Sequence, residues 1–213
     1  MVMVLSNAWR RWVAVAALVV TLTSCMVSRP LDQTATFDPA GGEGLVIVNV
    51  VERASSGATL FRGTVAFARY NPETLAITGA SGIRTGVLFR DALMFMNEGF
   101  GTPQRFRAYK LPPGEYALLA AQRYVGREHQ TTAYVQESPF VVRDNTPVFS
   151  IKAGEMLYIG ELGVNTGMFP ARLQIGIDVP GLHQFLKSMP ELKVEKIAIR
   201  PLESYTLVKN RAQ

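Results

Sequence analysis

Short apolar segments separated by turn signals make up most of the chain after residue 44. Leu45–Val51 is a short β-branched run, typical of a buried strand, and Phe61–Tyr70 alternates apolar and polar residues as a half-buried strand does. Further segments of this kind are Arg105–Leu111, Tyr116–Ala121, Thr131–Val142, Val148–Ile151, Met156–Val164 and Arg172–Val179. Weaker ones are Leu75–Ile77, Ile83–Phe89, Val194–Ile199 and Tyr205–Val208, and Asp91–Phe100 fits either a strand end or a short helix.

One segment alone has helical periodicity. Apolar residues recur there at the spacing of one helix face, at Leu182, Phe185, Leu186 and Met189. Pro180 suits the first turn of a helix and Pro190 ends it. The pattern therefore predicts an all-β fold, mainly an antiparallel β-sandwich or barrel, with one short C-terminal helix and no second domain boundary.

The first residues differ from the rest in charge and hydropathy. No acidic residue occurs before Asp32, and Arg10 and Arg11 precede the apolar run Trp12–Leu22. The run has the length of the hydrophobic region of a secretory signal and is short for a membrane span. It leads directly into Leu22-Thr23-Ser24-Cys25, which contains the single cysteine of the chain.

This tetrapeptide resembles the bacterial lipobox, in which an aliphatic residue and two small residues precede a lipidated cysteine. The resemblance implies that residues 1–24 are removed as a signal peptide and that Cys25 carries the lipid as the new N-terminus. Met26, where an aspartate would favour the inner membrane, implies the outer membrane facing the periplasm. There are two alternatives. One is an ordinary secretory signal that is followed by a cysteine by chance, and the other is a short membrane anchor.

Residues 25–44 are predicted to be a flexible, lipidated tether, because Pro and Gly punctuate them and apolar periodicity is weak. The β-sandwich domain is then expected over residues 45–213. Removing residues 1–24 takes away two of the 22 basic residues and none of the 17 acidic ones, so the formal charge falls from +5 to +3. No run of Lys or Arg with interleaved aromatics occurs, which disfavours nucleic-acid binding.

Two turn motifs give the clearest local signals. In Leu111-Pro112-Pro113-Gly114-Glu115-Tyr116 the prolines fix φ and the glycine permits a positive φ, which predicts a tight turn between strands. A second turn is expected at Lys152-Ala153-Gly154-Glu155, before Tyr158. We expect Tyr116 and Tyr158 to pack in the core with their hydroxyls at the sheet edge.

These motifs resemble the "P-x-G-x-Y" and "F-x-V-x-A-G-x-x-x-Y-I-G" pair of small bacterial lipoproteins of unknown function, whose fold is a transthyretin-like or carboxypeptidase-regulatory-like β-sandwich. The resemblance covers about residues 45–190, with the helix that ends at Met189-Pro190 included. It implies this β-sandwich fold. It also implies a set of structural turn residues, namely Pro112, Pro113, Gly114, Tyr116, Gly154 and Tyr158. It implies no catalytic residue.

Candidate chemistry is sparse. One cysteine and two histidines exclude an intrachain disulfide and a four-ligand Cys/His zinc site. Ser81 lies in a Gly-Ala-Ser-Gly stretch that lacks the last glycine of a nucleophile elbow. His129 is expected at a solvated hairpin tip, and His183 on the helix surface, where it could form half of a metal or base site with Asp178.

Carboxylate pairs could serve glycoside hydrolysis. Glu155, Glu161 and Asp178 are expected near strand ends as solvent-exposed turn residues, and no pair stands out. We therefore predict no catalytic, cofactor or metal site and a non-enzymatic envelope lipoprotein, either structural or binding an envelope protein. There are two alternatives. One is a lipoprotein subunit of a secretion apparatus. The other is a lipoprotein that binds a small ligand or a glycan, for which the candidate aromatic platforms are Tyr70, Phe100, Tyr124 and Tyr134.

Overall fold

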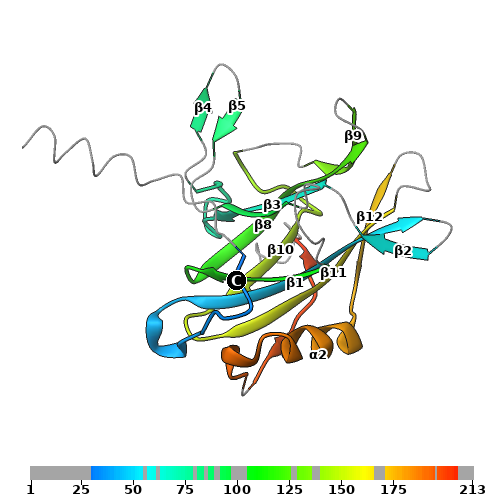
Figure 1. Cartoon of the computed structure of the whole chain (residues 1–213). Coiled ribbons are helices and arrows are strands. Elements are labelled where there is room, and N and C mark those ends of the chain that lie inside the picture. Colours follow the sequence, from blue (N-terminus) through cyan, green and yellow to red (C-terminus); the bar gives the residue numbers. More distant parts are fainter. Residues whose placement is uncertain are drawn as a thin grey trace, which may run out of the picture.

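Two six-stranded sheets form the body of the protein in the computed structural model (Figure 1). The structure describes residues 30–54, 57–60, 63–78, 81–83, 86–88, 92–96, 105–125, 129–135, 140–165, 171–194 and 196–205. The first sheet contains β1 (Gly44–Ala54), β2 (Gly57–Leu60), β7 (Phe106–Leu111), β11 (Met156–Asn165), β12 (Arg172–Gly176) and β13 (Ala198–Ile199). The second contains β3 (Gly63–Tyr70), β6 (Ala92–Met96), β8 (Gly114–Val125), β9 (His129–Val135), β10 (Pro147–Ile151) and β14 (Glu203–Ser204). A separate ribbon pairs β4 (Ser81–Ile83) with β5 (Gly86–Leu88).

The core lies between the two sheets. Alternate residues of β1, such as Val46 and Val48, are fully buried there against Phe67 of β3 and Leu118 of β8. Antiparallel pairs predominate, while β1 and β11 pair in parallel and so do β11 and β13. The prediction of an all-β fold with one short helix is confirmed.

Both recognised turns carry the chain from one sheet to the other. Pro112 and Pro113 join β7 of the first sheet to β8 of the second, so these consecutive strands are not a paired hairpin. The Tyr116 hydroxyl donates to the Pro112 carbonyl at 2.9 Å, and its ring stacks on Phe149 with centroids 5.1 Å apart. Gly154, at φ 72°, lies in the corresponding turn from β10 to β11.

The segment before β1 packs on the first sheet. The Leu31 N–H donates to the Ala108 carbonyl at 2.8 Å, and the Phe37 side chain is buried. Asp38 caps the 3-10 helix η1 (Pro39–Gly41), where its Oδ1 accepts from the Ala40 N–H at 2.9 Å. Within the described residues the packed part therefore begins at Leu31, whereas the sequence places the end of the tether at residue 44. Residues 1–29, with Cys25 and the expected cleavage site, lie outside the described residues.

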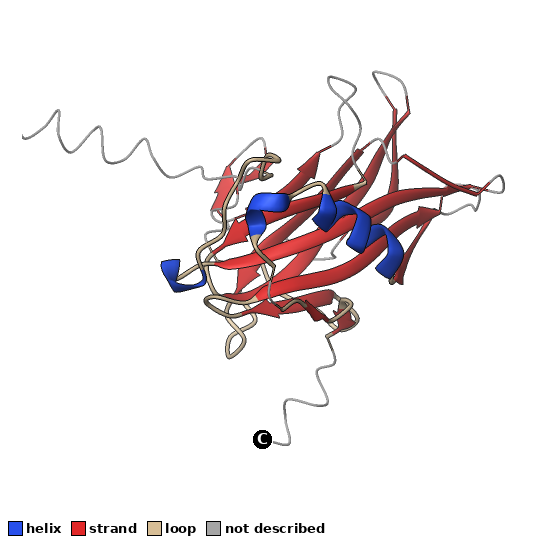
Figure 2. Cartoon of the chain, turned by 60° about the horizontal axis from the view of Figure 1, so that its bottom comes forward, coloured by secondary structure: helices blue, strands red, loops and turns tan. Residues whose placement is uncertain are grey.

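The outer face of the first sheet is covered by α2 (Val179–Lys187) and by the 3-10 helix η2 (Pro190–Leu192). Figure 2 shows α2 lying across the strands of this sheet. Leu182, Met189 and Leu192 are buried there, and Phe185 stacks on Phe106 of β7 with centroids 5.6 Å apart. The predicted helix is thus present, with Pro180 in its first turn.

The sequence leaves a strand end or a short helix open for segment 91–100, which contains the strand β6. Other boundaries differ from expectation. The strand predicted over Arg172–Val179 ends at Gly176, because Asp178 caps the helix that follows. The short last strand, β14, precedes Tyr205, whose ring packs edge-on against Tyr70 at 6.5 Å; residues 206–213 lie outside the described part of the chain.

Candidate functional site

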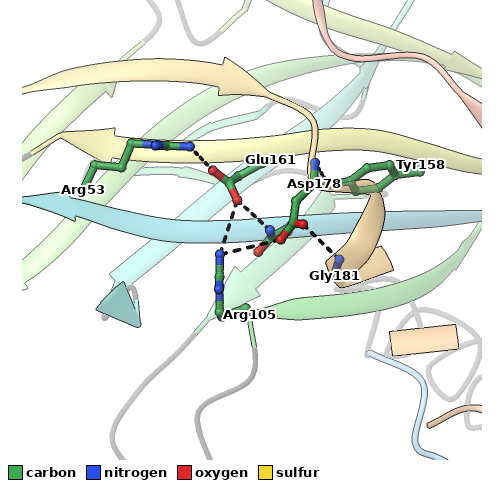
Figure 3. Close-up of polar contacts among 7 residues, drawn as sticks. Arg53, Arg105, Tyr158, Glu161, Asp178 and Gly181 are labelled. Atoms are coloured by element: carbon green, nitrogen blue, oxygen red, sulfur yellow. Dashed lines mark hydrogen bonds and ion pairs between the residues drawn. The ribbon is translucent and has the colours of Figure 1, made fainter. Parts of the chain in front are cut away.

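A polar cluster lies on the outer face of the first sheet, at the start of α2. Its members are Asn49 and Arg53 of β1, Arg105 before β7, Tyr158 and Glu161 of β11, and Asp178 before α2. Figure 3 shows the arginines on either side of Glu161, with Asp178 and Tyr158 beside them. These residues come from four separate parts of the chain.

A bulge at Gly160 brings Tyr158 and Glu161 to the same face. Tyr158 pairs with Ile47 and Glu161 pairs with Asn49, so two residues of β11 lie opposite one residue of β1. Gly160 adopts φ 95°, a left-handed conformation that glycine tolerates and other residues avoid. Without the extra residue, positions three apart on a strand would project to opposite faces.

Glu161 is the centre of the cluster. It is 4% exposed, and its Oε2 accepts from Asn49 Nδ2 at 2.8 Å. Arg105 Nη2 lies 3.4 Å from the same oxygen, and Arg53 pairs with Oε1. A Cβ at Gly163 would lie 2.7 Å from Arg53 Nε, so the glycine leaves room for that arginine. A buried carboxylate with this many donors is held in one position.

Asp178 links the cluster to the helix. Its Oδ1 accepts from the Gly181 N–H at 2.9 Å as the N-cap of α2, and its Oδ2 lies 3.8 Å from Arg105 Nη2. Its own N–H donates to the Tyr158 hydroxyl oxygen at 3.3 Å. Tyr158 is fully buried, and this burial raises the pKa of Tyr158 to about 12. The arrangement fixes the start of α2 against the sheet.

A cavity of about 420 Å³ adjoins the cluster. Leu31 from the N-terminal segment forms one wall. Phe185 of α2 and Met189, which follows the helix, form another, and Arg105 and Asp178 supply charged groups. Its volume falls within the range of about 300–1,000 Å³ that is usual for small-molecule sites. The Asn49 Oδ1 and the Arg105 Nε atoms are buried, with no hydrogen-bond partner among the described residues.

The burial of Glu161 differs from what the sequence predicts. The sequence predicts an exposed residue near a strand end, but Glu161 lies inside β11 and is buried, so that prediction is wrong. Asn49, which is also fully buried, was not singled out. The available signal was the same in both cases: a polar residue interrupts an otherwise apolar strand.

Among the other candidates that the structure describes, Asp178 joins Glu161 through Arg105, whereas His183 and Glu155 have separate surroundings. Asp178 caps the N-terminus of α2 and pairs with Arg105, while His183 is an exposed residue of the helix. Glu155 pairs with Arg200 at 2.5 Å and accepts from the Lys152 N–H at 3.0 Å. Within the described ranges no three His, Cys, Asp or Glu side chains are grouped to hold a metal ion.

The remaining candidates lie partly outside the described residues. His129 and Ser81 lie on β9 and β4, whose side chains at these positions are not described, and Phe100 and Cys25 are outside. Tyr70 is buried and Tyr134 packs against the core, so neither offers an exposed platform. The exposed aromatic residue among the described side chains is Phe140.

Comparison with protein-family models, with curated proteins and with solved structures found no match. Among the residues that the structure describes, no helix combines the length and the apolar character needed to cross a bilayer.

Proposed function

We propose that the chain is a non-enzymatic lipoprotein of the bacterial cell envelope, anchored through Cys25 and facing the periplasm, which binds an envelope protein. The anchor is supported by the N-terminal pattern: Arg10 and Arg11, the apolar run, and the single cysteine at the end of Leu22-Thr23-Ser24-Cys25. Lipidation would also protect this thiol from oxidation outside the cytoplasm.

Binding of a protein is supported chiefly by one edge of the first sheet. β12 and β13 both pair with the same side of β11, and each carries exposed isoleucine. Ile175, Ile177 and Ile199 are 38%, 52% and 40% exposed. Large apolar side chains along a strand edge are a feature that soluble proteins usually avoid, because such edges pair with other chains. This edge is therefore our candidate for the protein-binding surface.

The polar cluster supports a structural role rather than catalysis. Glu161 is engaged by Asn49 and two arginines, and Asp178 by a helix N-terminus and Arg105. A general acid or base needs a proton that the substrate can reach. Glu161 is buried away from such contact, and both carboxylates hold β1, β7, β11 and α2 together, while Asp178 also lines the cavity.

Small-ligand binding is a second candidate function, favoured by the cavity between Leu31 and α2. It combines a stacked aromatic pair, Phe106 and Phe185, with the charged groups of Arg105 and Asp178. Apolar walls with a few polar groups are typical of such sites.

Site-specific photo-crosslinking in living cells separates the two candidates. A photoreactive residue at Ile177 tests the sheet edge, one at Gln184 tests the cavity, and one at exposed Glu73 serves as the control. Protein binding predicts a discrete higher-mass adduct at Ile177 and none at Glu73. Ligand binding predicts a small mass increase at Gln184 without a protein adduct. Identical behaviour at all three positions contradicts both. Mass spectrometry of the adduct tests whether the partner belongs to a secretion apparatus.

A further inference from the structure

A groove of about 490 Å³ beside α2 combines a cationic rim with an apolar floor. The exposed side chains of Lys187, Lys193 and Lys196 stand around it, while Leu186 and Ile197 line its floor. Among the described residues that line the groove none is acidic, and Glu191 of η2 lies outside the lining. The groove is distinct from the cavity at Arg105 and from the isoleucine edge.

In the described part of the chain, no carboxylate pairs with any of the three lysines, so they are placed to meet an external anion. Lys187 lies in the last turn of α2, where a cation favours the helix dipole. That local role does not account for Lys193 and Lys196, which follow η2 and converge on the same groove.

The groove also lies close to the expected lipid. Met189 lines both this groove and the cavity whose opposite wall is Leu31. Leu31 is fixed to the sheet by its hydrogen bond to Ala108 and is six residues along the chain from Cys25. Six extended residues span at most about 20 Å. A lipid on Cys25 thus keeps this end of the protein at the bilayer surface.

We propose that the lysine groove docks on an anionic phospholipid surface, a contact that rests on the proposed anchoring at Cys25. The cationic rim complements the lipid phosphates, and Leu186 and Ile197 suit the boundary between headgroups and acyl chains. Docking orients the protein so that the α2 face meets the membrane, while the edge formed by β12 and β13 remains available to a partner.

Lysine footprinting on reconstituted vesicles tests the contact. The full chain, isolated with its anchor from cell membranes, is incorporated into vesicles of phosphatidylcholine alone or mixed with phosphatidylglycerol, and then acetylated and analysed by mass spectrometry. We expect labelling of Lys187, Lys193 and Lys196 to fall about threefold or more in the anionic vesicles. Labelling of Lys152, exposed in the β10–β11 turn, is expected to stay unchanged. High salt should restore labelling at the groove, because it screens exposed charges.

A double variant and a flotation control keep the outcomes distinct. Lys193→Gln combined with Lys196→Gln leaves the fold unchanged, since both side chains are exposed, and should abolish the protection of Lys187. Equal labelling of the groove lysines in both kinds of vesicle overturns the inference while the anchor stands. Protection that depends on the density of protein on the vesicle, and not on its lipid composition, does the same. A chain that does not float with either kind of vesicle overturns the proposed anchoring and the docking together.

Discussion

Tyr158 and Glu161 project from the same face of β11 although they are three positions apart, because Gly160 forms a bulge between them. This relationship places the Tyr158 hydroxyl against Asp178 and the Glu161 carboxylate against Asn49 and two arginines. One glycine therefore aligns the contacts that attach α2 to the sheet. Since α2 forms walls of the cavity and of the lysine groove, both surfaces depend on this bulge.

Gly160→Ala should destabilise the protein by about 2 kcal/mol or more, because a left-handed backbone disfavours a side chain. The new Cβ would also lie 2.6 Å from the Gly176 carbonyl oxygen. Gly176→Ala is the matched control, since its Cβ meets nothing within 4 Å, and it should change stability little. Urea unfolding measures both; equal stability of the two variants would contradict the role of the bulge.

Glu161→Ala should cost about 3 kcal/mol, because it leaves the buried Asn49 amide without its acceptor and removes the partner of two arginines. Glu155→Ala removes a carboxylate whose partner, Arg200, is 43% exposed, and should cost about 1 kcal/mol or less. The free energy of unfolding of the two variants, measured side by side, checks the difference. Similar small losses would show that burial of Glu161 contributes little.

The strands and the helix could be predicted because each has a local signal. Apolar runs marked β1 and β11, and the prolines around α2 marked its ends. The polar cluster could not be predicted in this way, because it depends on register: nothing local says that Asn49 lies opposite Glu161 on a parallel neighbour. The packing of Leu31 and Phe37 was missed for a similar reason, since two isolated apolar residues in a Pro- and Gly-rich segment show no period.

Asp178 should act mainly as a helix cap rather than as a charge. Asp178→Asn keeps a side-chain acceptor for the Gly181 N–H and loses only the exposed pairing with Arg105, so stability should change little. Asp178→Ala removes the cap and should cost about 1–2 kcal/mol. Thermal unfolding of both variants checks this order. An asparagine variant as unstable as the alanine variant would show that the charge dominates.

Stability should decline at alkaline pH in part through Tyr158. Its pKa is about 12 in the folded protein because of burial, against an ordinary value of 10.0. Between these values the unfolded chain has lost the proton that the folded chain keeps, so the free energy of unfolding falls as pH rises. Tyr158→Phe should flatten this decline without removing it, since burial raises the pKa of Tyr70 and Tyr109 as well. Urea unfolding between pH 10 and 12 measures the slope, and unchanged slopes would refute the assignment.

Lipidation of Cys25 is the claim on which the cellular location and the membrane contact both depend. Metabolic labelling with a palmitate analogue, in cells that carry either the wild-type chain or Cys25→Ala, tests it directly. We expect a labelled wild-type protein in the membrane fraction and a variant with no label, because the single cysteine is the proposed attachment site. Equal labelling of the two chains, or an unlabelled wild-type chain, would contradict it.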